Sequence, residues 1–364
     1  MRMLLPLALA ALLAGPVPAV ASATAPEIPQ HAVVLLYHRF GDSRYPSTDI
    51  DMPRFRAQLN YLASNGFHVW PLPRIIRHLR DGRPIPDHTV AITVDDAYRT
   101  VYENAYPLLK AHHFPFTVFV ATRVVDDHGA SFMTWQQMRE MAQHGATFAD
   151  HTVDHPHLVD RRQGEGGHAW AKRVRREIRK AQQRLQAKLG PNSNSGPKLF
   201  AYPYGEYNPA LQKMLRQMGY VSFGQQSGAI GPGSDLEALP RFPMAGRFGT
   251  MEQFRSKIDT LPLPVASATP DDPVSPPRDP PVMTVTLGSG PTRGERDQLS
   301  CYGSNQGRVP ITWLNADHTR FRVRAPKAFP ERRARYNCTV PAGGGRYYWY
   351  SHPWIWPGRP ESGG

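Results

Sequence analysis

The chain has 364 residues, of which 40% are hydrophobic and 20% charged, and its formal net charge at pH 7 is +13. This length and apolar content can fill a hydrophobic core, which excludes a largely disordered chain and predicts two domains, or one large domain with an appendage. The positive charge favours an anionic partner or is an inert basic surface, and because no RNA- or DNA-binding signature accompanies it we expect no nucleic-acid partner.

The first 23 residues have the features of a secretory signal peptide. Arg2 gives a positive start, residues 4–13 form an apolar run too short to span a bilayer comfortably, and Ala21, Ser22 and Ala23 match an A-x-A cleavage pattern. An uncleaved membrane anchor is the alternative. No later segment resembles a transmembrane helix, so we expect an exported mature chain that is periplasmic or extracellular.

From residue 32 onward, short apolar runs alternate with helical segments. The predicted strands cover 32–37, 89–94, 114–121, 146–150, 198–203 and 220–225, and the predicted helices cover 52–66, 102–113, 134–145, 168–189 and 209–219. This alternation predicts a parallel α/β architecture, and the sequence has no G-x-G-x-x-G dinucleotide motif. We favour a barrel over an open sheet, and in a barrel the chemistry collects at the C-terminal ends of the strands.

The predicted helix at 168–189 is strongly basic. Its one acidic residue, Glu177, stands among eight basic residues, which are Lys172, Arg173, Arg175, Arg176, Arg179, Lys180, Arg184 and Lys188. The pattern is typical of a solvated outer face, and the alternative is a surface that docks to an anionic envelope.

The last hundred residues change in composition. Residues 262–281 are rich in proline and small residues and are predicted to be a linker, and the short apolar runs of 282–364 predict a small all-β, sandwich-like C-terminal domain. Cys301 and Cys338 predict one disulfide worth about 3–4 kcal/mol, with two buried free thiols as the alternative. The aromatic run at 347–350, with alternate rings on opposite faces, either packs in the core or forms a sugar-stacking platform.

Two acidic residues, Asp95 and Asp96, stand side by side at the end of a predicted buried strand. Adjacent carboxylates at the end of a buried strand repel each other and cost free energy, so we expect them to hold a partner. The end of a later predicted strand supplies His151 and His155, and their spacing of four lets one short turn bring both imidazoles to one ion. Asp96 and the two histidines give one oxygen and two nitrogens, the ligand set of a catalytic divalent metal, and leave Asp95 as a general base.

Three stretches of the sequence resemble the motifs of a known family. TVDDAY at 93–98, HTVDHPHL at 151–158 and FAYPYGEYN at 200–208 are similar, in this order, to motifs of the polysaccharide deacetylases, carbohydrate esterases of the NodB-like type, family 4. The resemblance covers about 33–257 and is closest to the branch that deacetylates biofilm poly-N-acetylglucosamine. It implies a distorted (β/α)7 barrel, here expected at 24–261, in agreement with the alternation of strands and helices.

The resemblance also implies roles for individual residues. Asp95 matches the base that takes a proton from the attacking water. Asp96, His151 and His155 match the metal ligands, and the metal is expected to be zinc, with nickel or cobalt as alternatives. Tyr204 matches the residue whose backbone N–H binds the oxyanion formed from the substrate.

The sequence departs from the family pattern in two places. It has no histidine in 205–261, where the family usually has its general acid. His38 follows the first predicted strand, and a rearranged strand order would bring it to that place; a histidine packed in the core is the alternative. Ala201 stands where the family often has an arginine that braces the base, and Arg241 is the predicted substitute and a substrate-site residue.

Taken together, these residues predict a metal-dependent hydrolase that removes N-acetyl groups from an N-acetylhexosamine polysaccharide and releases acetate. The substrate could instead be peptidoglycan, a chitin-like oligomer or an O-acetyl ester. A non-catalytic glycan-binding protein of the envelope is the alternative from another class, but such a protein has no need of the complete set Asp95, Asp96, His151 and His155.

Overall fold

The structure is a computed structural model, and it describes residues 30–127, 129–190, 196–276 and 278–361. The predicted signal peptide at 1–23 lies outside these residues. Among the residues that are described, no helix is both long enough and apolar enough to span a bilayer.

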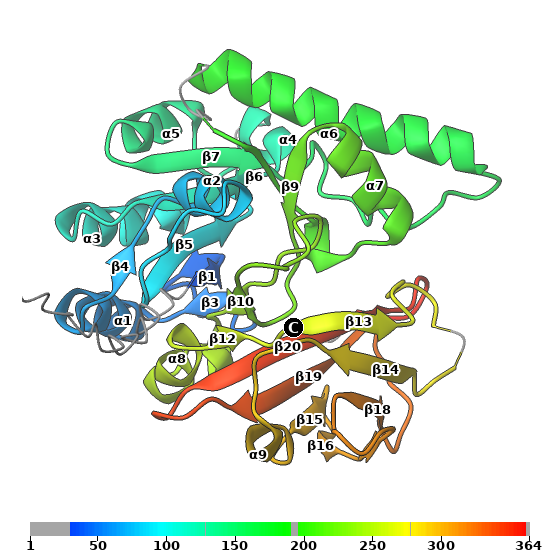
Figure 1. Ribbon diagram of the computed structural model, residues 1–364. Coiled ribbons are helices and arrows are strands. Elements are labelled where there is room, and N and C mark those ends of the chain that lie inside the picture. The colour runs from blue at the N-terminus through cyan, green and yellow to red at the C-terminus, as the bar shows by residue number, and fades with distance from the viewer. Residues whose placement is uncertain (1–29, 128, 191–195, 277, 362–364) are drawn as a thin grey trace, which may run out of the picture.

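A mixed sheet forms the centre of the molecule (Figure 1). Its strands are β1 (Ala32–Tyr37), β4 (His68–Val69), β5 (Thr89–Asp95), β6 (Phe116–Val120), β7 (Ala146–Asp150), β8 (Lys198–Ala201), β9 (Tyr220–Phe223), β10 (Ala229–Ile230) and β11 (Phe242–Pro243). The main path runs β10-β1-β5-β6-β7-β8-β9, with β11 beside β1 and β4 beside β5. The pair of β1 with β10 is antiparallel and the other neighbours are parallel, so the predicted α/β fold is confirmed.

Helices follow most of these strands and cover the sheet. They are α1 (Met52–Ser64), α2 (Leu72–Arg80), α3 (Tyr106–Ala111), α4 (Thr122–Asp126), α5 (Trp135–Ala142), α6 (Gly167–Leu189), α7 (Pro209–Gln217) and α8 (Met251–Ile258). Single turns lie at 101–105, 203–205 and 246–249, and a small parallel pair joins β2 (Arg39–Phe40) to β3 (Asp49–Ile50).

Local sequence explains where these elements begin. Strand β5 is buried along its whole length, as expected for a continuous apolar run in a parallel sheet. Helix α1 begins after Asp51, whose side chain accepts a hydrogen bond from the Arg54 N–H. Helix α5 begins after its N-cap residue Thr134, which forms a reciprocal capping box with Gln137.

The predicted barrel is not closed in the described residues. The sheet has two ends, at β10 and at β9. A single parallel bridge joins Phe223 of β9 to Leu239, and the chain then continues into β11, which pairs with β1. The segment 239–243 therefore spans the gap with isolated hydrogen bonds where a closed barrel would have a continuous ladder.

Helix α6 buries an apolar stripe and exposes half of its eight basic residues. Val174, Ile178, Ala181 and Leu185 are buried. Two of the basic side chains are neutralised by ion pairs, Arg173 with Glu165 and Arg184 with Asp126. A surface groove is lined by His168, Lys172, Arg175, Arg176, Arg179, Lys180 and Gln183. An anionic surface as its partner stays a prediction.

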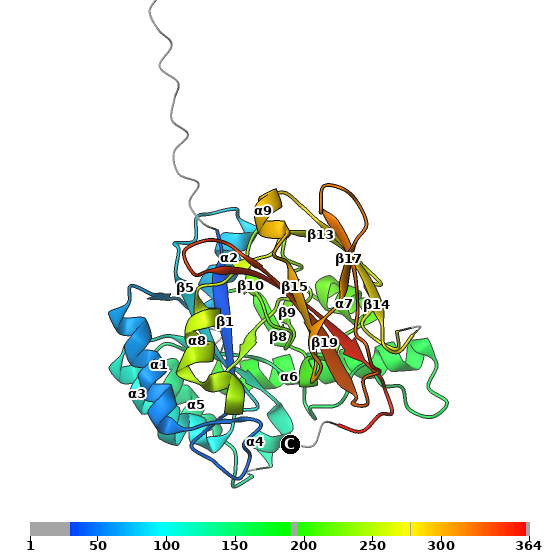
Figure 2. The same cartoon turned by 90° about the horizontal axis from the view of Figure 1, so that it is seen from below.

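The C-terminal residues form two further sheets, which in Figure 1 lie at the opposite end of the molecule from α6 and in Figure 2 face the viewer. Their strands are β12 (Leu261–Pro262), β13 (Val265–Thr269), β14 (Val282–Leu287), β15 (Ser300–Gly303), β16 (Gly307–Val309), β17 (Ile311–Trp313), β18 (Arg320–Arg324), β19 (Arg333–Pro341) and β20 (Tyr347–Ile355), with the short helix α9 (Arg293–Arg296). One sheet has the order β12-β20-β19-β15-β16 and the other β13-β14-β18-β17. The two share an apolar cluster that includes Met283, Phe321, Tyr336 and Trp354.

Part of the predicted linker at 262–281 is strand instead. Residues 265–269 form β13, which pairs with β14, and Val265 and Ala268 contact the apolar cluster of the two C-terminal sheets. Both β12 and β13 lie at the edge of their sheets. An edge strand tolerates neighbouring prolines because its outer N–H groups need no partner strand, so a proline-rich composition did not exclude strand here.

The aromatic strand β20 connects the two cores. Tyr348 and Tyr350 pack against the C-terminal apolar cluster, whereas Trp349 packs against the core of the α/β sheet. The Trp349 ring lies 5.2 Å from that of Phe242. The alternation of faces is therefore as predicted, and these three rings serve in packing; Tyr347 is 41% exposed.

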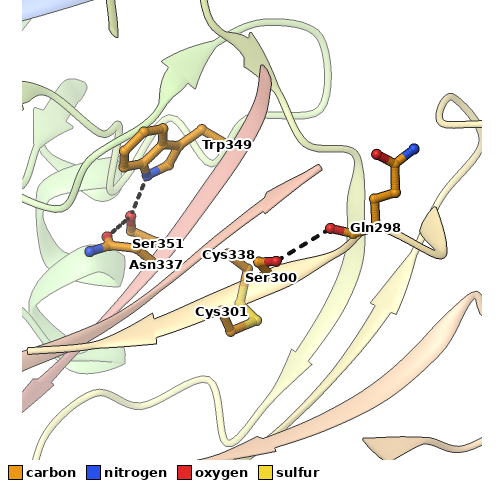
Figure 3. Close-up of a disulfide and its surroundings, with 7 residues drawn as sticks. All are labelled: Gln298, Ser300, Cys301, Asn337, Cys338, Trp349 and Ser351. Atoms are coloured by element: carbon orange, nitrogen blue, oxygen red, sulfur yellow. Dashed lines mark hydrogen bonds between the residues drawn. A yellow bond between two sulfur atoms is a disulfide. The ribbon is translucent and has the colours of Figure 1, made fainter. Parts of the chain in front are cut away.

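The two cysteines form the predicted disulfide (Figure 3). Cys301 of β15 and Cys338 of β19 lie opposite each other in the antiparallel register. Nearby, Trp349 donates from its indole nitrogen to Ser351, and Ser351 donates to Asn337. The disulfide thus cross-links β15 and β19, close to the polar contacts that Trp349 and Ser351 of β20 make.

Replacing both cysteines, Cys301→Ala with Cys338→Ala, is expected to lower the free energy of unfolding by about 3–4 kcal/mol, because the bond closes a loop of 37 residues in the unfolded chain. Urea denaturation measures this difference. Wild-type protein in reductant serves as the matched control and should unfold at the midpoint of the double variant. Equal midpoints for oxidised wild type and the double variant would contradict the expectation.

Candidate active site

The ends of three strands bring the predicted base, acid and brace together. Strand β5 ends at Asp95, and β1 ends one residue before His38. Tyr37 of β1 lies opposite Val94 of β5 in the parallel register, so His38 and Asp95 leave their strands side by side. On the other side of β1, strand β11 begins directly after Arg241. The first strand thus lies between β5 and β11, as the rearranged order requires.

The Asp95 carboxylate is buried and held by a two-point ion pair. Arg241 donates from Nη1 and Nη2 to its two oxygens at 2.8 Å each, and both side chains are 0% exposed. Arg241 is itself fixed by the Gly224 carbonyl at 2.9 Å and the Thr93 hydroxyl at 3.3 Å. Burial raises the pKa of Asp95, but Arg241 and His151 together lower it below its usual value. The carboxylate is therefore ionised and rigidly oriented.

Asp96, His151 and His155 converge on one point. The two Nε2 atoms of the histidines lie 3.1 Å apart, and each lies 3.4 Å from Oδ1 of Asp96. His151 is buried, while His155 and Asp96 are partly exposed. The cluster therefore sits at the surface end of the strands, with one side open to a ligand.

These separations fit a metal site. Ligand atoms bound at about 2.0–2.1 Å around a tetrahedral ion lie about 3.3–3.4 Å from one another. Two of the three distances between the donor atoms equal 3.4 Å, and the third, 3.1 Å, is slightly shorter. Nδ1 of His151 is 2.8 Å from the Ala201 carbonyl oxygen, so this nitrogen donates and leaves the Nε2 lone pair free for an ion. Burial lowers the pKa of His155 to about 4, which keeps its imidazole in the neutral form that a metal binds.

The same donor set suits zinc or another borderline divalent cation, because two imidazoles and one carboxylate leave positions for water and substrate. Two other groups of acidic and histidine side chains lie close together among the described residues. In the first, Asp87 and Asp259 are both paired with Arg346. In the second, Glu206 is paired with Arg332. A guanidinium already neutralises the carboxylates in both groups.

Unusual backbone conformations surround the metal cluster. Ten described non-glycine residues have positive φ, and five of them lie here: Asp96 (71°), Ala97 (57°), Thr152 (72°), His155 (52°) and Tyr204 (59°). Such conformations cost about 1–3 kcal/mol each and persist where the surroundings hold them. At Asp96 the turn explains how two adjacent carboxylates point to different partners.

The loop that carries His155 is anchored from helix α6. Glu177 accepts hydrogen bonds from the N–H groups of Val153 and Asp154 at 3.1 and 3.3 Å. Asp154 also forms an ion pair with Arg123. The one acidic residue of the basic helix is therefore a brace for the metal loop, a role that charge counting along the helix did not reveal.

The His38 imidazole lies in the electrostatic field of this site. Burial lowers its pKa, the carboxylates of Asp96 and Asp95 raise it, and the result lies below the usual value. The geometry thus brings His38, Asp95 and Arg241 together with the metal cluster.

Comparison with known proteins gives a family match over part of the chain. A family model described as Polysaccharide deacetylase matches residues 82–223, which include Asp95, Asp96, His151, His155 and Tyr204. This segment is therefore similar to the polysaccharide deacetylases. His38 and Arg241 lie outside the matched segment, as expected if the rearranged strand order supplies them from elsewhere in the chain.

Curated relatives are similar to this chain over part of its length. A poly-β-1,6-N-acetyl-D-glucosamine N-deacetylase of Escherichia coli K12 is 25% identical over 253 residues, covering 60% of this chain and 37% of that protein. An enzyme with the same name from Staphylococcus aureus MRSA252 is 26% identical over 197 residues, covering 53% and 66%. The chain therefore spans little more than a third of the length of the Escherichia coli relative.

Solved structures agree with the fold. IcaB from Ammonifex degensii matches with a TM-score of 0.53 and 26% identity, covering 63% of this chain and 97% of that one. The Streptococcus pyogenes deacetylase PplD, in complex with acetate, matches with a TM-score of 0.56 and 23% identity, covering 63% and 99%. The matches to these two structures leave more than a third of this chain without a counterpart.

The loop of Tyr204 has partners that the sequence did not reveal. The Tyr204 ring stacks on His157 at 3.8 Å and contacts the edge of His155 at 4.5 Å. His157 in turn bonds the buried Glu206 at 2.9 Å. Glu206 lies within the third motif, but a glutamate beside a turn gives no signal of burial. The stacked His157 ring therefore packs against Tyr204 and links it to Glu206.

Gly205→Ala is expected to displace this loop. Gly205 has a φ of 71°, and a Cβ there would lie 2.7 Å from Cβ and 2.8 Å from the backbone nitrogen of Gln225. We expect a loss of about 1–3 kcal/mol in the free energy of unfolding together with reduced activity. Thermal unfolding and acetate release measure the two effects. Gly219→Ala is a control, since it has a similar φ of 80° but open space around it; equal losses in both variants would assign the effect to φ alone.

Proposed function

We propose that this protein is a metal-dependent N-deacetylase of an N-acetylhexosamine polymer of the poly-β-1,6-N-acetylglucosamine type, and that it releases acetate. The relatives with that printed name support the choice of polymer. The proposal extends to export through the signal peptide at 1–23. The catalytic part is 24–261, with an incompletely closed version of the (β/α)7 barrel, and an all-β part follows it.

One observation carries the proposal: three donor atoms with the spacing of metal ligands lie beside an ionised carboxylate that a buried arginine orients. A glycan-binding protein has no need to keep a buried Asp95–Arg241 pair next to a ligand set. Burying two charges costs desolvation free energy, so the presence of this pair beside a ligand set favours a catalytic site over a site that only binds.

The residues can divide the reaction among them. An amide is a poor electrophile, and its nitrogen leaves badly unless it gains a proton. A divalent cation held by Asp96, His151 and His155 would polarise the acetyl carbonyl and acidify water. Asp95, fixed by Arg241, accepts the proton of the attacking water.

The later steps fall to other parts of the site. The backbone N–H of Tyr204 stabilises the tetrahedral oxyanion. The pKa of His38 lies below its usual value, so the imidazole must first gain a proton. It then donates that proton to the departing amine, which leaves a glucosamine unit and acetate. Its position beside Asp95 brings acid and base to the same scissile bond from neighbouring strands.

Mass spectrometry of defined oligomers tests the proposal. The full mature chain is incubated with N-acetylglucosamine oligomers of β-1,6 and β-1,4 linkage, with and without a chelator. We expect loss of acetyl groups from the β-1,6 oligomers in particular, and no loss with chelator. Equal or greater loss from β-1,4 oligomers would redirect the assignment to chitin-like or peptidoglycan substrates, and no loss from any oligomer would reject it.

A further inference from the structure

Two arginines of the C-terminal part reach into the loops of the metal site. Arg332, directly before β19, donates from Nε and Nη2 to the two carboxylate oxygens of Glu206 at 2.7 and 2.8 Å. Its Nη2 also donates to Asp160 at 2.7 Å. Glu206 is 0% exposed and Arg332 4%. One guanidinium thus ties the loop after His151 to the loop of Tyr204, although these partners lie 172 and 126 residues away in the sequence.

The contact continues from Glu206 to the reacting groups. Glu206 accepts from His157, whose ring stacks on Tyr204 with an interplanar angle of 9°. The same tyrosine ring is in T-shaped contact with His155, a proposed metal ligand. Charge-assisted hydrogen bonds of this kind are short and directional, so the chain of contacts fixes orientation.

The neighbouring arginine holds the backbone of the same loop. Arg333 donates from Nη1 to the Tyr204 carbonyl oxygen at 3.3 Å, and its guanidinium lies 5.3 Å from the centre of the Tyr204 ring. Tyr204 has a φ of 59°, an unfavourable conformation for a residue with a side chain. Fixing its carbonyl and ring also fixes the direction of its N–H, the proposed oxyanion donor.

The acidic side chains in this region do not form a second metal site. His157, Glu206 and Glu361 lie close together, but Arg332 pairs with Glu206 and Arg333 pairs with Glu361. Two guanidiniums at such short range would repel a divalent cation. The cluster is therefore an ionic clamp between two parts of the chain.

We propose that Arg332 and Arg333 are positioning residues of the deacetylase site, so that the C-terminal β part completes the active site by holding the Tyr204 loop. The inference rests on the proposed function for its catalytic consequence. It assigns a role to residues beyond the segment 82–223 that the family model matches.

Arg333→Met is the decisive variant, because the side chain is 30% exposed and its loss should leave the fold intact. We expect kcat to fall by about 10- to 100-fold with little change in KM, since the loop misplaces a group that acts in the transition state. Arg333→Lys keeps the charge and one donor and should recover part of kcat. Arg322→Met, an exposed arginine of β18, is the matched control and should behave as wild type.

Hydrogen exchange gives a reading that does not depend on activity. Peptides containing residues 203–206 should exchange faster in Arg333→Met than in wild type or Arg322→Met, while peptides of β5 stay unchanged. Unchanged exchange at 203–206 overturns the inference even if wild type shows no deacetylation. Unchanged kcat and KM in an active Arg333→Met protein overturns it as well. Wild type without activity but with the expected exchange pattern rejects the proposed function and leaves the clamp.

Discussion

Asp95→Asn is expected to lower the rate of acetate release by about 10²–10⁴-fold, because asparagine keeps the shape of the side chain but cannot accept the proton of the attacking water. The structure adds a second effect. Arg241 is fully buried and would lose its counter-charge and one of its two acceptors on residue 95, and an unpaired buried charge costs about 3–5 kcal/mol of stability. The catalytic rate and the stability must therefore both be measured, by acetate release and by thermal unfolding of the same sample.

The two effects can be separated with a matched pair. Arg241→Met keeps the carboxylate of Asp95 but removes its brace, so it should lose comparable stability and retain more activity than Asp95→Asn at a temperature where both are folded. Asp317→Asn, an exposed aspartate of the C-terminal part, should resemble wild type in both assays. Full activity in folded Asp95→Asn would remove this carboxylate from the mechanism.

His155→Ala is expected to weaken zinc binding by at least about 100-fold, the upper end of what loss of an outer-shell partner costs, because it removes one of three direct donors. The two remaining donors, Asp96 and His151, would still contact each other, but two ligands alone should not retain zinc when the free zinc concentration is low. Equilibrium dialysis against zinc, followed by elemental analysis, measures the bound metal without reference to activity.

The control for this prediction lies on helix α6. His168→Ala removes an exposed histidine that does not belong to the cluster and should leave the zinc content at the wild-type value. Equal zinc affinity for His155→Ala and wild type would exclude His155 as a ligand. Loss of zinc in both variants would indicate non-specific surface binding.

The grouping of Asp96, His151 and His155 could be predicted from the sequence, because Asp96 and His151 each directly follow a strand that the local pattern of apolar residues predicts, and His155 lies in the same loop as His151. Asp95 and Asp96 follow a continuous apolar run, and His151 and His155 follow another, so parallel strands bring them to one edge. His38 and Arg241 needed the rearranged strand order as well, and the register of β1 between β5 and β11 agrees with it.

Other features could not be predicted because they depend on tertiary contacts. The pair of Arg332 with Glu206 joins residues that are 126 apart, and neither residue type is distinctive at its position. Helix α6 looked like a basic surface, yet Glu177 within it anchors the metal loop. The open edge of the sheet depends on a few hydrogen bonds around Leu239, which leave no periodic pattern in the sequence.

Composition misled the reading of residues 262–281. Prolines and small residues predicted a free linker, but Val265 and Ala268 supply enough apolar contact to form an edge strand. Trp349 of β20 is a related case. The aromatic run allowed a sugar-stacking platform, but Trp349 packs against the core of the α/β sheet.

The most direct test is a zinc titration of acetate release. Chelated and dialysed protein is mixed with a β-1,6-linked N-acetylglucosamine oligomer, and zinc is added in fractions of an equivalent. Acetate release should start near zero, rise in proportion to added zinc and level off at one equivalent per chain. A full rate from the chelated protein, or a rate that ignores zinc, would contradict a site in which Asp96, His151 and His155 hold the reacting cation.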